Sequence, residues 1–210
     1  MNKIPSFEIN HLKLKKGVYV SRKDVVGGEV ITTFDLRMKR PYKDAPMTTG
    51  SMHVLEHIIA TYLRNDKMWS HRIIYFGPMG CRTGFYLLIR GDYTSTDIIP
   101  LLERAYDYAS DFNGDIPGCT TIECGNCYDM DLPEAINDAA DYYNLLIAPK
   151  KYNLEYPPIT EAEKEKSRRK YEREKKQQLK LLKEMQQANE QNNLEEQDKE
   201  EIVEENDSQD

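Results

Sequence analysis

The sequence predicts an α+β fold, in which an antiparallel sheet has helices packed on one side and a charged C-terminal tail follows. Two kinds of pattern support this prediction: short segments with the two-residue alternation of strands, and longer segments with the apolar spacing of a helix face. Residues 1–150 contain all 11 glycines and all 4 cysteines, and this length can bury a hydrophobic core. We therefore predict a folded domain over 1–150 and a charged helical extension over 151–210 that fades into a disordered acidic tail.

Strands are expected at 4–9, 29–38, 72–76 and 83–90. The clearest of them is 29–38, where two sets of residues alternate as they do on the two faces of a half-buried strand. The last two segments are separated by residues 77–80 (Gly-Pro-Met-Gly), whose composition is typical of a turn. We expect these strands to pair in an antiparallel sheet.

Three helices are expected in the same region. Ser51 to Arg64 has apolar residues at spacings of three and four, which form one stripe along a helix. The segment from Asp97 to Ser110 contains Pro100, which we place in the first turn, where a missing N–H costs little. Asp131 and Glu134 resemble a capping box that opens a third helix, ending at about residue 147.

The composition of the chain changes after Pro158, where charged residues become frequent and apolar residues sparse. Thr160 and Glu163 form another capping-box pattern, and pairs such as Glu165–Arg169 are spaced for ion pairing along a helix. Apolar residues are too sparse for a coiled coil of three or four heptads. A solvated helix is therefore expected, with a partner-binding helix as the alternative, and the acidic stretch 189–210 is predicted to be disordered.

Composition and charge exclude several classes of function. The formal net charge of -7 leaves no basic surface that would favour nucleic acid. No apolar run reaches the roughly 18 residues of a membrane-spanning helix, and the first six residues lack the apolar stretch of a signal peptide. We therefore expect a cytoplasmic protein that binds neither nucleic acid nor a membrane. In that reducing compartment the cysteines favour metal binding or catalysis over disulfides.

The pentapeptide His53-Val54-Leu55-Glu56-His57 carries the most chemical information. On a helix, its two imidazoles stand on one face about one turn apart and can bind one divalent metal ion. The carboxylate of Glu56 can transfer protons for a metal-bound substrate or water. Two histidines and a glutamate also meet on helices by chance, so the motif alone leaves a structural role open.

The cysteines supply two further candidate groups. Cys81 lies on a glycine-flanked turn next to Arg82, and a nearby positive charge favours the reactive thiolate; an inert buried thiol is the alternative. Cys124 and Cys127 form a single C-x-x-C pair, which can donate a third ligand to the histidine pair. Three protein ligands are typical of catalytic rather than structural metal sites. Cys119 has no motif around it and is expected in the core or a loop.

These groups, in this order and at these separations, resemble S-ribosylhomocysteine lyase, the LuxS family of bacterial quorum-sensing enzymes. The resemblance spans about residues 4–148, and residues 151–210 lie outside it. Its most specific part is residues 78–86 (Pro-Met-Gly-Cys-Arg-Thr-Gly-Phe-Tyr). The other matching stretches are residues 6–11 (Ser-Phe-Glu-Ile-Asn-His), 34–37 (Phe-Asp-Leu-Arg), 53–57, 124–125 (Cys-Gly), Leu132 and Glu134-Ala135.

The resemblance implies a homodimer with active sites at the subunit interface. It also implies one divalent metal ion per subunit, expected to be Fe(II), which Zn or Co can replace. The metal ligands would be His53, His57 and Cys124. The catalytic acid–base pair would be Cys81 and Glu56. The substrate-binding residues would be Ser6, His11 and Arg37.

The implied reaction cleaves S-ribosylhomocysteine to homocysteine and 4,5-dihydroxy-2,3-pentanedione, the precursor of autoinducer-2. The carbonyl of the substrate starts at C1, remote from the C5–S bond, so two isomerisations would first move it to C3. The C4 proton then becomes acidic, and homocysteine leaves by β-elimination. A divalent metal ion polarises carbonyl oxygens as a Lewis acid, and the acid–base pair transfers the protons.

Two positions depart from the family pattern. Tyr75, six residues before Cys81, stands where the family often has an acidic residue, so contacts to the homocysteine end of the substrate are expected to differ. Cys127 stands where the family often has tyrosine, and it offers a second candidate ligand. Cys124 is preferred because the Cys-Gly pair is the one that matches.

Two other functions fit parts of the pattern. An inverted-zincin metallopeptidase also carries H-x-x-E-H on a helix, but it usually takes its third ligand from a later carboxylate, and here the downstream candidates are thiols. A non-enzymatic zinc module could use His53, His57, Cys124 and Cys127, which would fill all four positions around the ion and make folding depend on the metal.

Overall fold

The computed structural model of the protein describes residues 8–148 and 152–207, with side chains described up to residue 187. The chain divides into two compact units, Met1–Pro158 and Ile159–Asp210. Of the predicted strand at 4–9, residues 4–7 lie outside the described residues, and residues 8 and 9 form a bend. The first unit contains every candidate site residue that the structure describes.

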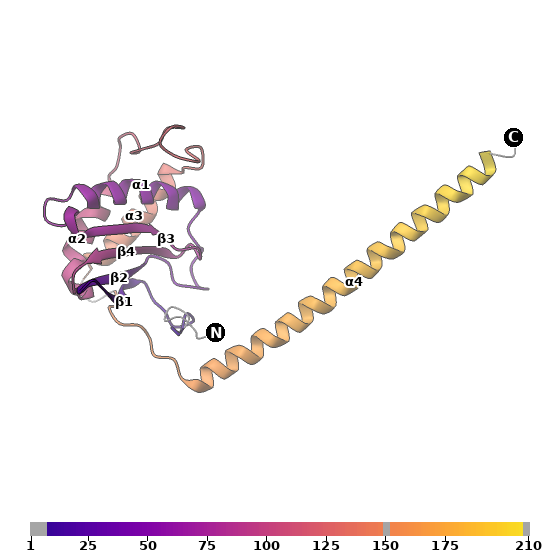
Figure 1. The fold of residues 1–210 in the computed structure, drawn as a ribbon, viewed down its shortest axis with the longest axis horizontal. Helices are drawn as coiled ribbons and strands as arrows, with labels where there is room; N and C mark the ends of the chain where they lie inside the picture. The colour runs from indigo at the N-terminus through magenta and orange to yellow at the C-terminus, as the bar shows by residue number, and fades with distance from the viewer. Residues whose placement is uncertain (1–7, 149–151, 208–210) are drawn as a thin grey trace. The chain divides into compact units, whose positions relative to one another are not determined.

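The sheet of the first unit has four antiparallel strands in the order β1-β2-β4-β3 (Figure 1). Their bounds are Gly17–Val26 for β1, Glu29–Arg37 for β2, Ile73–Pro78 for β3 and Gly84–Arg90 for β4. The predictions for β2, β3 and β4 are confirmed, whereas β1 was not predicted. Charged residues in its second half and a register shift between Val20 and Arg22 obscure the alternation that marks a strand.

Two glycines explain how β1 turns into β2. Gly27 and Gly28 both have positive φ angles, 60° and 84°. A two-residue hairpin whose backbone matches the twist of the strands needs positive φ at both central positions, which glycine adopts without a steric penalty. The hairpin therefore closes tightly, and β2 is the inner strand that pairs with β4.

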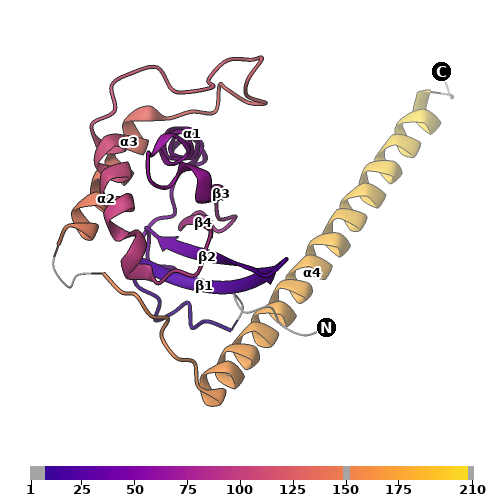
Figure 2. The ribbon, with the colours of Figure 1, turned by 60° about the vertical axis from the view of Figure 1, so that its left-hand side comes forward.

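Three helices, α1 (Thr49–Asn65), α2 (Ser95–Ser110) and α3 (Leu132–Leu146), lie on one side of the sheet (Figure 2). A short 3-10 turn, η2 (Ser70–Arg72), precedes β3. Helix α1 packs against β3 and against α2 and α3. The predicted α+β class, with helices on one side of an antiparallel sheet, is confirmed.

The start of α2 corrects one prediction. The Asp97 carboxylate accepts a hydrogen bond from the N–H of Thr94 at 2.7 Å, so the helix begins at Ser95 rather than at Asp97. Pro100 is therefore the sixth helical residue and does not lie in the first turn. A proline at this depth removes one main-chain hydrogen bond, which the other contacts of α2 tolerate.

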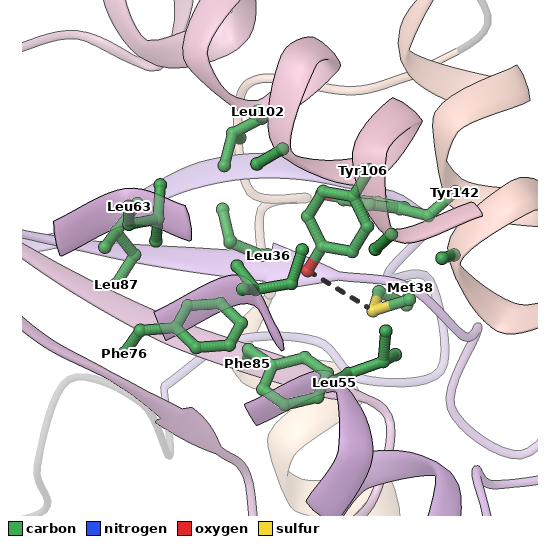
Figure 3. Packing of buried hydrophobic residues seen from close by; sticks show 14 of the residues in the cluster. Leu36, Met38, Leu55, Leu63, Phe76, Phe85, Leu87, Leu102, Tyr106 and Tyr142 are labelled. Atoms are coloured by element: carbon green, nitrogen blue, oxygen red, sulfur yellow. Dashed lines mark hydrogen bonds between the residues drawn. The ribbon is translucent and has the colours of Figure 1, made fainter. Parts of the chain in front are cut away.

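The core lies between the sheet and the helices. Phe85 and Leu87 of β4 are fully buried, with Phe85 beside Leu55 and Leu87 beside Leu63 of α1 (Figure 3). The ring of Phe76 stacks on that of Phe85, with centroids 4.8 Å apart. Tyr106 of α2 is also buried, and its hydroxyl points at the sulfur of Met38 at 3.6 Å (Figure 3). This packing fixes α1, which carries the histidine pair, against the sheet.

The second unit consists of α4, Glu161–Asp207. The capping box at its start is confirmed, because the Thr160 N–H donates to Glu163 at 3.0 Å and the Glu163 N–H donates back to the Thr160 hydroxyl at 3.3 Å. The ion pair between Glu165 and Arg169 also forms, at 2.8 Å. The helix continues through residues 189–207, where the sequence predicts disorder. Within the described residues, no helix combines the length and the apolar character that crossing a membrane requires.

Candidate functional site

Helix α1 presents the histidine pair. The helix begins where the Thr48 hydroxyl accepts a hydrogen bond from the Ser51 N–H at 3.1 Å. His53 and His57 lie one turn apart on its half-buried side, and their ring centroids are 4.8 Å apart. The two imidazoles therefore face the same region, as their spacing predicts.

Main-chain carbonyls orient both imidazoles. Nδ1 of His53 lies 2.9 Å from the carbonyl oxygen of Asp129, and Nδ1 of His57 lies 2.6 Å from that of Pro117. A carbonyl oxygen can only accept, so each Nδ1 must carry the hydrogen, and each Nε2 is left with its lone pair. That is the tautomer in which Nε2 can bind a metal ion, and such outer contacts typically orient histidine ligands.

Cys124 reaches the histidine pair from the loop between α2 and α3. A turn closed by the Cys124 N–H and the Thr120 carbonyl, at 2.9 Å, holds the residue. Its Sγ lies 3.3 Å from Nε2 of His53 and 3.4 Å from the N–H of Asn126, which can donate to the sulfur. The ligand atoms of His53, His57 and Cys124 all lie within 4.8 Å of one another.

These three donors fit a single divalent metal ion. Metal–nitrogen bonds of about 2.0–2.1 Å and metal–sulfur bonds of about 2.3 Å place tetrahedral ligands roughly 3.3–3.8 Å apart, and the Cys124–His53 separation falls at that value. Two neutral imidazoles and one thiolate suit Zn, Fe or Co alike, so the donor set leaves the identity of the metal open. Three protein ligands are the number found in catalytic sites.

Cys127 does not join this group. Among the described residues, the only cluster of three or more potential ligands is the one made by His53, His57 and Cys124. The main-chain carbonyl of Cys127 instead accepts a hydrogen bond from the half-buried thiol of Cys119, at 3.6 Å. The choice of Cys124 over Cys127 is therefore supported, and a closed site with four ligands is not.

Glu56 lies on α1 between the two histidines and is half-buried. Within the described part of the chain its carboxylate makes no hydrogen bond or ion pair. A carboxylate without a structural partner is available to a bound molecule, which is what a proton carrier needs.

The second group of predicted residues surrounds Cys81, on the turn between β3 and β4. Cys81 is exposed, and its Sγ lies 3.1 Å from the hydroxyl of Thr83 and 3.7 Å from Nη1 of Arg37. Arg82 has a φ of 56°, an uncommon value for a residue with a side chain, and its N–H donates to the carbonyl of Met79 at 2.9 Å. The turn therefore presents an exposed thiol beside a guanidinium.

Two glycines flank Cys81 and differ in their surroundings. A Cβ atom built on Gly84 would lie 2.0 Å from the carbonyl oxygen of Leu36, so this position requires glycine where β4 meets β2. A Cβ built on Gly80 would have no atom of the described residues within 4 Å. The close approach at Gly84 brings the turn next to Arg37.

Arg37 is held by a buried ion pair. Its guanidinium donates to both oxygens of Asp35, at 3.1 Å from Nε and 2.6 Å from Nη2, and also to the hydroxyl of Thr83. Both charged side chains are almost fully buried. Burial disfavours the charged guanidinium, but the Asp35 carboxylate outweighs this effect and raises the pKa of Arg37 above its ordinary value. Arg37 thus stays cationic beside Cys81.

The remaining predicted residues are less closely connected. His11 is half-buried, and its Nδ1 lies 3.0 Å from the carbonyl of Ile9. Ser6 lies outside the described residues. Tyr75 is 45% exposed, and its ring lies over Gly77, where an added Cβ would be 1.9 Å from the Tyr75 hydroxyl oxygen.

The structure therefore shows two groups of candidate residues rather than one. His53, His57 and Cys124 converge at α1, and Arg37 and Cys81 meet at the sheet. Within the described residues, no hydrogen bond or ion pair joins the two groups.

Sequence reasoning missed three residues that support these groups. They are Asp35, Thr83 and Tyr156. A signal existed for Asp35, because it falls two residues before Arg37 on the same face of a strand and carries the opposite charge. No local pattern marks Tyr156, whose hydroxyl reaches Asp35 from 121 residues away.

These observations define a class of protein. It is an α+β domain in which a helix-borne histidine pair and a loop cysteine form a candidate site for one metal ion, and in which a second cysteine lies beside a buried arginine. Comparison with known families identifies the particular one: the model of the S-ribosylhomocysteinase (LuxS) family matches residues 4–152. The chain belongs to this family.

Individual relatives are similar over nearly their whole length. The S-ribosylhomocysteine lyase of Clostridium beijerinckii is 52% identical over 158 residues, which is 75% of this chain and 99% of that protein. The lyase of Desulfotalea psychrophila is 52% identical over 160 residues, with the same coverage. That of Porphyromonas gingivalis is 48% identical over 158 residues, again with 75% and 99% covered. The similarity therefore extends to complete proteins of this kind rather than to one motif.

Proposed function

We propose that this protein is a metal-dependent S-ribosylhomocysteine lyase, which cleaves S-ribosylhomocysteine to homocysteine and 4,5-dihydroxy-2,3-pentanedione. The observation that carries the proposal is the convergence of His53, His57 and Cys124 in a member of the S-ribosylhomocysteinase family. The product is the precursor of autoinducer-2, so the protein would serve quorum sensing. We assign the lyase to residues 1–150 of the chain and a cytoplasmic location to the protein.

The metal ligands would be His53, His57 and Cys124. When bound, a divalent ion, which we expect to be Fe(II) with Zn or Co as substitutes, would act as a Lewis acid toward carbonyl oxygens of the sugar. The protein itself fixes the tautomer of both imidazoles through the carbonyls of Asp129 and Pro117. It also supplies the Asn126 N–H, which donates to the Cys124 sulfur at 3.4 Å and helps to orient this ligand.

Cys81 and Glu56 are the residues that we assign to proton transfer. Each of the two carbonyl migrations removes a proton from one carbon and delivers a proton to its neighbour. In the elimination, a base takes the C4 proton, the C4–C5 double bond forms, and the C5–S bond breaks with its electron pair leaving on sulfur. Protonation of that sulfur completes homocysteine. The other fragment is an enol, which gains a proton at C5 and loses the proton of its C4 hydroxyl to become 4,5-dihydroxy-2,3-pentanedione. The Arg37 guanidinium lies 3.7 Å from the Cys81 sulfur, next to the atom that would exchange these protons.

We further propose that the active enzyme is a homodimer with its sites at the interface, and that Ser6, His11 and Arg37 bind the substrate. The separation of the two residue groups supports this proposal. Cys81 and Arg37 belong to the sheet, whereas the metal donors belong to α1 and to the loop before α3. A second copy of the chain would supply one group to the other.

The activity can be tested with protein purified anaerobically and loaded with Fe(II). We expect free thiol to appear when S-ribosylhomocysteine is added. We expect C81A to fold, to keep its metal and to release homocysteine at least about 100-fold more slowly, the range that one acid–base group contributes. A thiol reagent and metal analysis on the same samples measure both quantities.

Two outcomes would contradict these assignments. Absence of thiol release by the metal-loaded wild type would overturn the proposed activity. Near-native release by C81A would leave the activity standing but would remove Cys81 from the acid–base pair. Ser110→Ala is a matched control, because its hydroxyl donates to the carbonyl of Asp107 on α2 rather than to any residue of the proposed site.

A further inference from the structure

The segment that follows α3 returns to the sheet before the chain enters α4. Asn153 accepts a hydrogen bond from the Val18 N–H at 2.9 Å and donates its own N–H to the carbonyl of Lys16 at 3.3 Å. A Cβ built on Gly17 would lie 2.2 Å from the carbonyl oxygen of Asn153, so the two backbones touch there. Residues 152–158 are thus attached along the start of β1.

Tyr156 extends this attachment to the buried ion pair. Its ring stacks on the ring of Tyr19, with centroids 4.7 Å apart and planes 8° from parallel. Its hydroxyl donates to Oδ2 of Asp35 at 2.9 Å. The same carboxylate oxygen accepts from Nη2 of Arg37 at 2.6 Å. Tyr156 and Arg37 therefore share one acceptor atom.

The shared acceptor connects Tyr156 to the turn between β3 and β4 that carries Cys81. With Asp35 held by two donors, the guanidinium of Arg37 is fixed in orientation, and its remaining nitrogen, Nη1, points to Thr83 and Cys81. Asp35 is 1% exposed, so water cannot replace a donor that is lost. Removal of the Tyr156 hydroxyl would let the carboxylate rotate, and the guanidinium would follow it.

We propose that Tyr156 is a positioning residue, which holds Asp35 so that Arg37 stays oriented toward Cys81 and toward substrate. The part that concerns substrate rests on the proposed function of Arg37. Tyr156 lies beyond residues 4–152, which the family model matches, so this contact is contributed by the segment that leads into the C-terminal extension.

The test is the variant Y156F in the full-length, metal-loaded protein. Phenylalanine keeps the ring that stacks on Tyr19 and removes only the hydroxyl. We expect KM for S-ribosylhomocysteine to rise about tenfold with a smaller change in kcat, because a misplaced binding group costs affinity first. The matched control is Y152F, since within the described residues the Tyr152 hydroxyl has no hydrogen bond and its ring packs against the core.

A second readout does not depend on the proposed function. The rate at which iodoacetamide alkylates Cys81 in substrate-free protein, followed on the Cys81 peptide by mass spectrometry, reports the guanidinium beside the thiol. We expect Y156F to slow this rate about threefold or more, because its Arg37 no longer stays near the sulfur. Y152F should keep the wild-type rate.

The outcomes separate the two proposals. If the wild type releases no homocysteine but Y156F still slows alkylation, the lyase assignment fails and the positioning of Arg37 stands. If Y156F only lowers the melting temperature, while KM and the alkylation rate at a temperature where it is fully folded match those of Y152F, Tyr156 is merely structural and our inference is overturned. If Y156F fails to fold, Y156H takes its place, because histidine restores a donor: a wild-type alkylation rate in folded Y156H supports our inference, and a rate slowed about threefold or more overturns it.

Discussion

At the scale of single residues, the candidate metal site depends on main-chain groups that are not themselves ligands. The carbonyls of Asp129 and Pro117 decide which nitrogen of each imidazole is free. The positive φ of Gly118, 67°, belongs to the turn that follows Pro117, and the Gly118 Cβ position lies only 3.5 Å from Nδ1 of His57. The histidine pair alone does not make a metal site. The loop that contacts it orients both imidazoles and supplies Cys124.

A first prediction concerns His57. We expect His57→Ala to bind far less than one metal ion per chain, with an affinity reduced by at least about 100-fold, since even an outer-shell contact is worth 10- to 100-fold. Elemental analysis after dialysis against a weak chelator measures the occupancy. His71→Ala is the control, because His71 is exposed and contacts Arg72 instead of the site. Full occupancy in the His57 variant would remove His57 from the ligand set.

At the scale of elements, α1 is fastened at both ends. Near its start, the Ser51 hydroxyl donates to the buried carboxylate of Asp138 on α3, at 2.6 Å. At its end, Asp66 accepts from the N–H groups of Met68 and Trp69, at 2.9 and 3.1 Å, and from Arg104 of α2 at 2.9 Å. The element that carries both histidines is therefore fixed against two other helices.

The contacts at the end of α1 predict a dependence of stability on acid pH. Partial burial alone would raise the pKa of Asp66, but Arg104 and the two N–H groups outweigh it and lower the pKa below its ordinary value of 3.8. The resulting stabilisation is fully present above the unfolded-state pKa and is lost as the pH falls through the folded-state pKa. We expect D66N to lower the free energy of unfolding by about 1–3 kcal/mol at pH 7.

Urea denaturation of the wild type and D66N at pH 7 and pH 3 checks this expectation. The difference in unfolding free energy between the two proteins should shrink at pH 3, which lies below the ordinary pKa of 3.8 that the carboxyl has in the unfolded chain. Asp115→Asn, at an exposed loop position, should behave like the wild type at both values. A difference that is equal at both pH values would contradict the role of the charge.

The elements also show what a sequence can reveal. Helix α1 and β2 were predictable because their apolar residues keep a regular spacing, and β4 because it is a short apolar run next to a turn. Strand β1 was not, because its outer half carries charged side chains and a register shift. Its existence follows only from pairing with β2, which a search for local periodicity does not detect.

The same limit applies to the candidate site. Its ligands and Cys81 were predictable because each lies in a motif with its own spacing or turn. Thr83 and Tyr156 were not, because their importance comes from what they contact, and Tyr156 meets Asp35 across 121 residues of chain. That contact exists only once residues 152–158 are attached to β1.

At the scale of the whole molecule, four tyrosine side chains of the first unit meet in two ring-to-ring pairs. Tyr106 and Tyr142 are in edge-to-face contact in the core, 4.8 Å between centroids, and Tyr19 and Tyr156 stack on the other side of the sheet. Burial is the main cause that raises the pKa of each of these four phenols above 10.0, and nearby aspartates add to it. All four therefore stay neutral in the folded protein.

These phenols predict a loss of stability at alkaline pH. In the unfolded chain they release their protons near pH 10, whereas in the folded protein they cannot. Their contribution is fully present below the unfolded-state pKa and is lost as the pH rises toward the higher folded-state values. We expect the free energy of unfolding to fall steadily between pH 9 and pH 11.

Denaturation curves at several alkaline pH values measure this slope. Y106F should reduce it, because the Tyr106 hydroxyl contacts only the sulfur of Met38 in the described residues and its loss removes one ionisable group. Y128F, at a phenol that is 87% exposed, should leave the slope unchanged. Equal slopes for Y106F and the wild type would show that buried phenols do not govern the alkaline limit.

The two glycines that flank Cys81, Gly80 and Gly84, differ in whether they tolerate a side chain. At the start of β4 even a methyl group would collide with β2, whereas a Cβ just before the thiol would have no described atom of its own chain within 4 Å. A reporter side chain, such as a fluorescent amino acid, can therefore be installed at position 80. It would sense the arrival of a molecule at the thiol without disturbing the strands beneath it.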